Sequence, residues 1–329
     1  AVLNEALAAL ARYALIIGDL GIDDVQTVAT AAARDAENGG EFLAAVGDLG
    51  LKPRLLSGEE EATASAMGAL GAFPGARGVV ADLGGGSLEL VSIADNECRE
   101  ASSLRLGTLR LPALRAEGPE AFEAAVHEQL ASVGWAAAHP GPMYMIGGTW
   151  RALAAYAMRY LDYPLTDPHG FILNREDAAA LIKTVSRTDI DRIRAIPRVT
   201  SSRAESLPEA GQLLHVLLKH YDPERIVVSA WGLREGLMMG RIDPYQLSQD
   251  PLLAGVVDFA ESRVVDQSAL QAIEAVASKY EASGKRIVLQ HLSRDCHRLL
   301  TRAGHLVVDS DDDPDYGLAV NYGVRTGIL

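Results

Sequence analysis

The sequence holds few cysteines, few aromatic residues and no long apolar run. Its 329 residues include only Cys98 and Cys296, which are too few and too far apart for a disulfide framework. We therefore expect free thiols in a reducing compartment. No run reaches the roughly 18 apolar residues of a membrane-spanning helix, and the N-terminus has no signal-peptide pattern. These features predict a cytoplasmic protein without membrane insertion.

Basic residues are also in the minority. The chain has 30 Lys and Arg residues against 44 Asp and Glu residues, a formal net charge of −14. Such a charge repels nucleic acid at long range, so we expect no nucleic-acid partner. A polyanionic substrate would need local cations from arginines or bound Mg²⁺. The hydrophobic fraction of 48% and the abundance of alanine favour a helix-rich α/β protein with more than one domain.

Alternating patterns fill the first 73 residues. Helical spacing of apolar residues covers 4–17, and strands are predicted at 25–29 and 53–56, with helices at 31–37 and 41–49 between them. This alternation is typical of α/β units. Because a helical pattern starts almost at Ala1, we expect that an upstream segment is missing. A turn-rich boundary at 72–78 precedes the next unit.

A glycine-rich hairpin follows that boundary. An apolar strand at 79–82 ends in Asp82, and a second strand at 88–93 carries Glu89. The bend between them holds Gly84, Gly85, Gly86 and Ser87. Glycines let backbone N–H groups approach an anion, and the two carboxylates could hold hydrated Mg²⁺ or activate water. A bulged hairpin with solvated acids is the structural alternative.

Two further segments have competing interpretations. Ser57 to Glu60 fits a capping box at a helix start, while one glutamate of the run 59–61 could instead act as a general base that faces the glycine-rich bend. Arg34 lies early in the helix predicted at 31–37, where a helix start and a guanidinium suit phosphate, although an exposed surface arginine fits equally.

Two strand–turn–helix junctions occur later in the chain. The first follows a predicted strand at 143–146 and consists of Gly147, Gly148 and Thr149, with Thr149 as the expected N-cap. The second follows a predicted strand at 226–229. Such junctions can receive phosphate, but they are also common structural elements.

The order of these motifs resembles that of the exopolyphosphatase and guanosine pentaphosphate phosphohydrolase (Ppx/GppA) family. The motifs are Thr-Ala-Ala-Ala-Arg, Ser-Gly-Glu-Glu-Glu-Ala, Asp-x-Gly-Gly-Gly-Ser-x-Glu, Gly-Gly-Thr-x-Arg and Gly-Leu-Arg-Glu-Gly, within residues 4–245. The resemblance implies an actin-like ATPase fold with two ribonuclease-H-like domains. It also implies Mg²⁺-dependent hydrolysis of the terminal phosphoanhydrides of inorganic polyphosphate or guanosine pentaphosphate.

The resemblance also implies roles for single residues. Glu61 matches the catalytic glutamate, and Glu89 matches a second glutamate that serves as base or metal partner. Asp82 matches the Mg²⁺-associated aspartate, and Arg34 matches an arginine that binds substrate phosphate. The phosphate-binding residues would be Gly84, Gly85, Gly86, Ser87, Gly147, Gly148 and Thr149. Leu88 stands where the family commonly has Thr, a departure that leaves the loop backbone intact.

The resemblance divides the chain into four parts. Residues 1–73 would be the remnant of a first ribonuclease-H-like domain, 74–245 a second, 246–262 a linker helix and 263–329 a small β/α tail. The tail, over 264–316, resembles the C-terminal half of a STAS domain of SulP-type transporters. The family's first phosphate loop, Asp-x-Gly-Ser-Asn-Ser, is absent from the chain.

That absence leaves two alternatives to a hydrolase. One is a catalytically weak or inert phosphate-binding or interaction protein with a STAS-like tail. The other is a sugar kinase or ATPase of the same superfamily, although such kinases normally place an aspartate where this chain has Ser-Gly-Glu-Glu-Glu. The sequence leaves open whether the protein forms a homodimer, and which of the two phosphoanhydride substrates it prefers.

Overall fold

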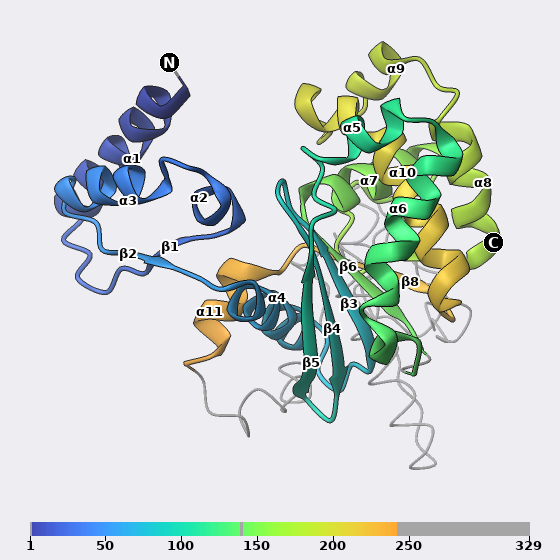
Figure 1. The fold of residues 1–329 in the computed structure, drawn as a ribbon, viewed down its shortest axis with the longest axis horizontal. Coiled ribbons are helices and arrows are strands. Elements are labelled where there is room, and N and C mark those ends of the chain that lie inside the picture. Colours follow the sequence, from blue (N-terminus) through green and yellow to red (C-terminus); the bar gives the residue numbers. More distant parts are fainter. Residues whose placement is uncertain (1, 139–140, 242–329) are drawn as a thin grey trace, which may run out of the picture.

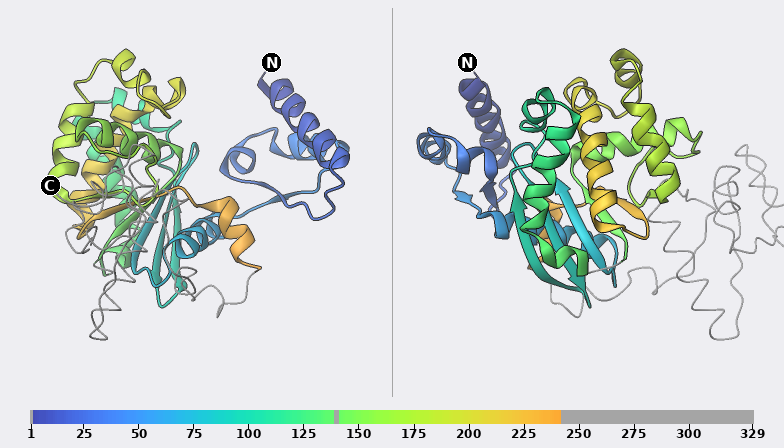
Figure 2. Two further views of the ribbon diagram at one scale, coloured as in Figure 1. Left: turned by 180° about the vertical axis from the view of Figure 1, so that it is seen from behind. Right: turned by 45° about the vertical axis from the view of Figure 1, so that its right-hand side comes forward.

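A computed structural model describes residues 2–138 and 141–241 of the chain. Its first part is a small N-terminal lobe, residues 2–56, built on two parallel strands. The lobe contains α1 (Val2–Asp19), β1 (Thr27–Ala29), α2 (Ala31–Asp35), α3 (Gly39–Asp48) and β2 (Pro53–Leu55). Figures 1 and 2 show this lobe standing to one side of the larger part, and the chain continues from it into α4 (Gly58–Ala72).

A six-stranded sheet organises the larger part. Its strands are β3 (Gly78–Leu83), β4 (Leu88–Ala94), β5 (Glu97–Leu104), β6 (Met143–Ile146), β7 (Ile172–Leu173) and β8 (Ile226–Ser229). They lie in the order β5-β4-β3-β6-β8-β7. The first three form an antiparallel meander, β6 and β8 run parallel to β3, and β7 is antiparallel to β8 at the edge.

Helices cover both faces of this sheet. One face carries α4 and α11 (Leu233–Met239), which pack against each other. The two helices approach closely because Gly68 of α4 has no side chain: a Cβ there would collide with the backbone of Gly232. The other face carries most of the remaining helices (Figure 1). These are α5 (Leu111–Ala116), α6 (Pro119–Ala131), α7 (Gly148–Tyr160), α8 (Arg175–Val185), α9 (Ile190–Arg194) and α10 (Ser201–Tyr221), with a 3₁₀ turn at Gly134–Ala138.

The period-two alternation of the strands divides the core between the two faces. In β3, Val79 and Ala81 point into the cluster beneath α6, α7 and α10, whereas Val80 points toward α4. The helix cluster contains the fully buried Phe122 and Trp150. Since β3 is buried on both faces, the acidic residue near its end is held in a low-dielectric environment.

The structure confirms most of the predicted elements. The strands at 143–146 and 226–229 have the predicted bounds, and the helix predicted after Ser57 is α4. The strands β5 and β7 were not predicted. Helix α7 begins at Gly148 with Gly147 as its N-cap, so the prediction that Thr149 is the N-cap is wrong.

Some predictions lie outside the described residues. The linker helix at 246–262 and the STAS-like tail at 263–329 are among them, as is Cys296. The described Cys98 is a free thiol, and burial raises its pKa to about 11. Within 2–138 and 141–241, no helix combines the length and the apolar character that crossing a bilayer requires. The predicted domain division stays a prediction, although α4 packs on the six-stranded sheet rather than on the N-terminal lobe.

Candidate active site

The glycine bend joins β3 to β4 at the end of the sheet nearest the N-terminal lobe. The Gly84 N–H donates to the Ser87 carbonyl at 3.0 Å, which closes the bend. Asp82 and Glu89 are directly paired across the two strands. Because opposed residues of an antiparallel pair point to the same face, one hairpin presents both carboxylates together, as the sequence predicted.

A second loop, residues 105–110, holds the bend from outside. The Thr108 N–H donates to the Gly84 carbonyl at 3.0 Å, and the Leu109 N–H donates to the Gly85 carbonyl at 2.9 Å. Arg110 Nε donates to the Gly86 carbonyl at 2.9 Å. Three bend carbonyls are therefore bound, whereas the N–H groups of Gly85, Gly86 and Ser87 donate to no atom of the described residues. This arrangement presents unpaired donors to an incoming anion.

Gly107 makes this contact between the two loops possible. A Cβ at Gly107 would collide with backbone atoms of Gly85, Gly86 and Ser87. Sequence reasoning missed this loop, because a single glycine after an unpredicted strand carries little signal. Recognising β5 would have placed Gly107 beside the bend, since β5 pairs with β4.

Taken as a whole, the residue Asp82 is partly exposed, but the surrounding core buries its carboxylate. Burial raises the pKa of Asp82 to about 6, and nearby Glu61 adds to the rise. A hydrogen bond from Ser65 and the positive charge of Arg151 oppose the shift. The carboxyl group of Asp82 is therefore close to half-protonated near pH 6.

Glu89 is more strongly affected, with only 1% of its surface exposed. The pKa of Glu89 is raised to about 8, mainly by burial and to a smaller extent by the negative charges of Glu61 and Asp82. Hydrogen bonds from Ser87 and Ser103 act in the opposite direction, the latter at 2.8 Å between Ser103 Oγ and Glu89 Oε1. These charge effects show that the three acids lie within electrostatic reach of one another.

Neighbouring glutamates at the start of α4 have separate roles. Ser57 Oγ accepts from the Glu60 N–H at 3.1 Å, and Glu60 Oε2 accepts from the Ser57 N–H at 2.8 Å. This confirms the capping box. Glu61 is 9% exposed and accepts from Arg34 Nη1 at 3.3 Å. Since Glu60 alone serves the cap, Glu61 is left available for the site.

Arg34 reaches the site from the N-terminal lobe. Its Nη1 also donates to the Leu56 carbonyl at 2.8 Å, and its Nε lies 3.9 Å from Asp35 Oδ1. The prediction that Arg34 lies early in its helix is wrong: α2 has five residues, and Arg34 occupies the last turn. The arginine arrives beside Glu61 because α2 packs against the glycine bend, where a Cβ at Gly86 would lie 2.9 Å from Ala31 Cβ.

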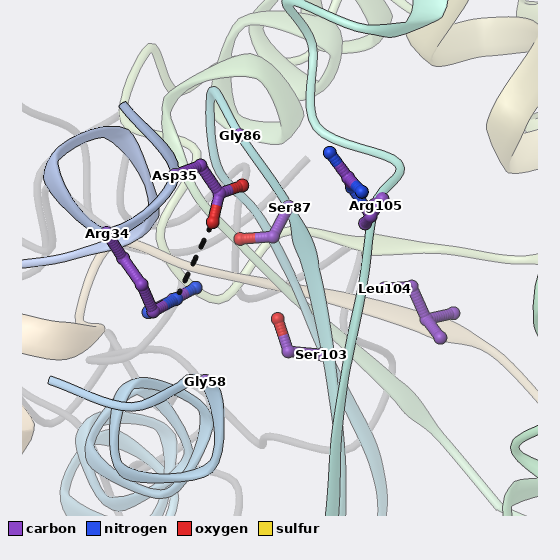
Figure 3. Close-up of a pocket in the computed structure, with 8 residues that line it drawn as sticks. All are labelled: Arg34, Asp35, Gly58, Gly86, Ser87, Ser103, Leu104 and Arg105. Atoms are coloured by element: carbon purple, nitrogen blue, oxygen red, sulfur yellow. Dashed lines mark ion pairs between the residues drawn. The ribbon is translucent and has the colours of Figure 1, made fainter. Parts of the chain in front are cut away.

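A cavity of about 400 Å³ lies between the lobe and the bend. Glu61, Asp82 and Glu89 are not among the residues that line it, although Arg34, Ser87 and Ser103, which interact with these acids, are. Figure 3 shows the side chains of Arg34, Ser87 and Ser103 around one open space. The other lining residues are Asp35, Gly58, Gly86, Leu104 and Arg105. Arg105 was not predicted from the sequence, and it forms no ion pair with a described residue. The cavity therefore combines an anion cradle with one unpaired cation.

The junction at Gly147 lies on the other side of Asp82. A Cβ at Gly147, whose φ is +113°, would come within 3.1 Å of Asp82 Oδ1. The guanidinium of Arg203 lies over Gly148, and Thr149 is buried. This junction is adjacent to the acids but lines none of the cavity in Figure 3.

The residues present suit a hard cation shared with a substrate. Within the part of the chain that the structure describes, no three His, Cys, Asp or Glu side chains form a group that could hold a metal ion. Mg²⁺ usually takes only one or two carboxylates and completes its octahedron with water and substrate phosphates. Asp82 and Glu89 offer such a pair, and a cation would favour their ionised forms against the burial and the weaker repulsion by Glu61 that raise their pKa values.

The fold and this site define an α/β protein with an anion-binding bend beside buried carboxylates. The chain belongs to the Ppx/GppA phosphatase family, whose model matches residues 1–244. This confirms the predicted family over most of the described chain. The match ends at residue 244, so it gives no support to the predicted STAS-like tail.

Individual relatives are distant. The chain is 27% identical over 280 residues to Retrograde regulation protein 2 of Saccharomyces cerevisiae, covering 77% of this chain and 48% of that protein. It is 27% identical over 257 residues to Exopolyphosphatase 1 of Mycobacterium tuberculosis, covering 73% of each. The chain thus spans about half the length of the yeast protein.

Solved structures give the same result. An exopolyphosphatase from Cytophaga hutchinsonii matches with a TM-score of 0.66 at 21% identity, covering 74% of this chain and 83% of that one. The Ppx/GppA enzyme of Aquifex aeolicus matches with a TM-score of 0.60 at 27% identity, covering 73% and 82%. These similarities confirm the predicted α/β fold of actin-like ATPase type.

Proposed function

We propose that this protein hydrolyses terminal phosphoanhydride bonds of inorganic polyphosphate and releases orthophosphate. The observation that carries the proposal is the bend whose carbonyls are bound by the 105–110 loop while the N–H groups of Gly85, Gly86 and Ser87 remain free. Preorganised N–H donors stabilise the charge that develops on a transferring phosphoryl group. Membership of the Ppx/GppA phosphatase family and similarity to exopolyphosphatases support the same reaction class.

In this mechanism the terminal phosphoryl group binds at the bend, and Glu61 orients and deprotonates the attacking water. Glu61 suits the role because it is nearly buried, is held by Arg34, which lines the cavity, and is not used by the capping box. Arg34 holds the Glu61 carboxylate and can bind a substrate phosphate with its remaining donors. The Ser87 hydroxyl, which donates to Glu89 in the protein alone, would have to turn from that carboxyl to donate to the phosphate.

Asp82 and Glu89 are the proposed holders of Mg²⁺, which would offset the negative charge of the bound phosphates. Glu89 must lose its proton to take this role, and its pKa of about 8 in the protein alone opposes that loss near neutral pH. A second function for Glu89, as a base that takes a proton from water, fits the same raised pKa.

Guanosine pentaphosphate is the alternative substrate that the family name suggests. Both substrates end in the same phosphoanhydride, and in the proposed mechanism the residues around the bend would contact only that terminal group. The preference between them therefore depends on contacts beyond the cavity of Figure 3.

The test is phosphate release by the purified chain with Mg²⁺ and polyphosphate, guanosine pentaphosphate or ATP. We expect release from the first two and little from ATP. Glu61→Gln should lower turnover by about 10²–10⁴-fold, the usual contribution of a positioned base. The matched control is Glu59→Gln, which neutralises an exposed glutamate two residues earlier. Equal turnover in the two variants would remove Glu61 from the mechanism.

A second candidate function is phosphate binding without hydrolysis. It is favoured by the pKa of about 8 for Glu89, which leaves that carboxyl protonated at neutral pH in the absence of a cation, and by the commitment of Arg34 to Glu61. Saturable binding of polyphosphate by the unmodified chain, with no phosphate release at any Mg²⁺ concentration, would establish this function and reject the hydrolase.

A further inference from the structure

A second cavity lies at the corner between α8 and α9. It measures about 470 Å³ and is lined by Lys183, Thr184, Arg187, Thr188, Asp189 and Arg192. None of these residues lines the cavity at the glycine bend. Helix α9 nevertheless lies at the same end of the molecule as that bend, at the top of Figure 1 and in both views of Figure 2. We call it the corner cavity.

The corner cavity gathers positive charge on an acidic protein. Lys183, Arg187 and Arg192 are exposed, and none forms an ion pair with any residue that the structure describes. Asp189 is the one carboxylate among the lining residues, and its Oδ1 accepts from the Asp191 N–H at 2.9 Å as the N-cap of α9. Three cations and one carboxylate leave a formal charge of +2, against −14 for the whole chain.

The cavity walls are held in place by their own hydrogen bonds. Thr188 Oγ1 donates to the Thr184 carbonyl at 2.9 Å, so the 2.6 Å contact with Tyr156 uses the tyrosine hydroxyl as donor. Thr184 Oγ1 donates to the Ala180 carbonyl at 2.8 Å. Since both threonine protons are used, recognition of a ligand rests on the three cations. The fully buried Ile193 fixes α9 behind them.

From this geometry we propose that the corner cavity binds the chain of a linear polyphosphate, at a second site separate from the one where the bond is cleaved. The identity of the ligand rests on the proposed function. Lys183 lies in the last turn of α8, and Arg187 lies in the turn that follows it, where its N–H donates to the Thr184 carbonyl at 3.0 Å. Both side chains line the corner cavity with Arg192. Separate cations on one rigid corner suit an anion with repeated charges, and the net charge of the chain disfavours nucleic acid.

The candidate active site explains why a second cation site is needed. Two arginines near its cavity are already paired: Arg34 with Glu61, and Arg110 with Asp35 at 2.7 Å. Arg105 is the lining cation that has no ion pair among the described residues. A long anionic chain therefore gains little Coulomb attraction there. Holding another part of the same chain at the corner cavity raises the effective concentration of its end at the bend.

The experiment measures polyphosphate binding by the whole chain in a Glu61→Gln background, which prevents consumption of the ligand. The test variant adds Lys183→Gln, Arg187→Gln and Arg192→Gln. The probes are long-chain inorganic polyphosphate, tripolyphosphate and single-stranded DNA. We expect the dissociation constant for long chains to rise about tenfold, the sum of three exposed charge contacts. The dependence of binding on salt concentration should weaken as well.

The matched control carries Arg12→Gln, Lys52→Gln and Arg159→Gln in the same background. These three cations are also exposed and form no ion pair with described residues, so the control removes the same charge elsewhere. We expect less than a twofold change for it. An equal loss in both triple variants would overturn the proposal, because the effect would then belong to net charge alone.

Three further measurements separate the second site from net charge, from nucleic-acid binding and from hydrolysis. With Glu61 intact, the corner variant should raise KM for long chains and leave kcat for tripolyphosphate unchanged. A loss of DNA binding as large as the loss of polyphosphate binding would reject a polyphosphate site in favour of nucleic acid. If the unmodified chain releases no phosphate but corner-dependent binding persists, the proposed hydrolysis fails while the second site stands.

Discussion

The two parts of the molecule differ sharply in how well they are buried. In the six-stranded sheet, β3 and β4 are buried along nearly their whole length. The N-terminal lobe has four buried apolar residues, Ala31, Val46, Leu51 and Leu56. Instead, Leu15 of α1 and Leu20 in the turn after it are each 68% exposed.

The candidate active site is divided between these two parts. The sheet supplies Asp82, Glu89 and the bend, on a rigid support, whereas the lobe supplies Arg34 and Asp35. The lobe is joined to the sheet by a few contacts, including Arg34 to Glu61 and Arg110 to Asp35. The comparison indicates that core packing fixes the positions of the acids and of the anion-binding bend, whereas the position of Arg34 depends on where the lobe lies.

The largest expected effect comes from breaking the sheet side of the site at Gly107. Gly107→Val places a branched side chain against the backbone of the bend and should lower phosphate release by about 10²-fold or more, since displacement of the reacting groups by about 1 Å has that cost. The control is Gly47→Ala, where an added Cβ meets nothing within 4 Å. It should slightly stabilise α3. Retained activity in Gly107→Val would show that the bend tolerates displacement.

Glu89→Gln tests the burial of the sheet acids. The folded-state pKa of about 8 lies above the ordinary value of 4.5, so the native state binds more protons than the unfolded state between these values. The stability that the carboxyl contributes is therefore present below about pH 4.5 and lost as pH rises through 8. The variant should be inactive, yet melt several degrees above the parent at pH 9 without Mg²⁺.

A scan of melting temperature against pH checks this expectation. Glu97→Gln, at an exposed position on β5, is the control and should leave the pH dependence unchanged. Adding Mg²⁺ to the parent should reduce its loss of stability between pH 7 and 9, because a cation favours the ionised carboxylates. A parent whose stability does not fall over this range would contradict the raised pKa of Glu89.

Arg34→Ala tests the lobe side of the site. It removes hydrogen bonds to the Leu56 carbonyl and Glu61, and we expect KM to rise about tenfold because charge-assisted hydrogen bonds are lost. The melting temperature should change little. Arg54→Ala is the control, since Arg54 pairs with Glu60 outside the cavity. A large drop in melting temperature with unchanged KM would assign Arg34 a purely structural role.

The smallest effect is expected at the junction of the two parts. Ser57→Ala removes the hydroxyl that accepts from the Glu60 N–H and should cost about 1 kcal/mol of stability, with kcat nearly unchanged. Thr200→Ala is the control, because Thr200 is an N-cap whose side chain makes no capping hydrogen bond. Denaturant unfolding measures both. A kcat loss in Ser57→Ala would show that the cap also positions Glu61.

Much of the candidate site could be predicted from local sequence. The placement of Asp82 and Glu89 on one hairpin followed from two apolar strands around a glycine-rich bend, and the capping box followed from spacing at the start of α4. The strand β5 was missed because its pattern is polar and largely exposed, and with it the loop that carries Gly107 and Arg105. The prediction that Arg34 lies early in its helix was wrong because α2 is only five residues long, which puts Arg34 in the last turn.

The sequence by itself determined the strands β3, β4, β6 and β8, the glycine bend and the pair of acids on one hairpin, since each depends on the conformational preferences of neighbouring residues. The tertiary structure alone decided which groups meet the bend. The 105–110 loop occupies its carbonyls, Arg34 arrives from a separate lobe, and burial in the sheet raises the pKa values of Asp82 and Glu89. These properties arise from contacts and desolvation between distant segments, which no local pattern encodes.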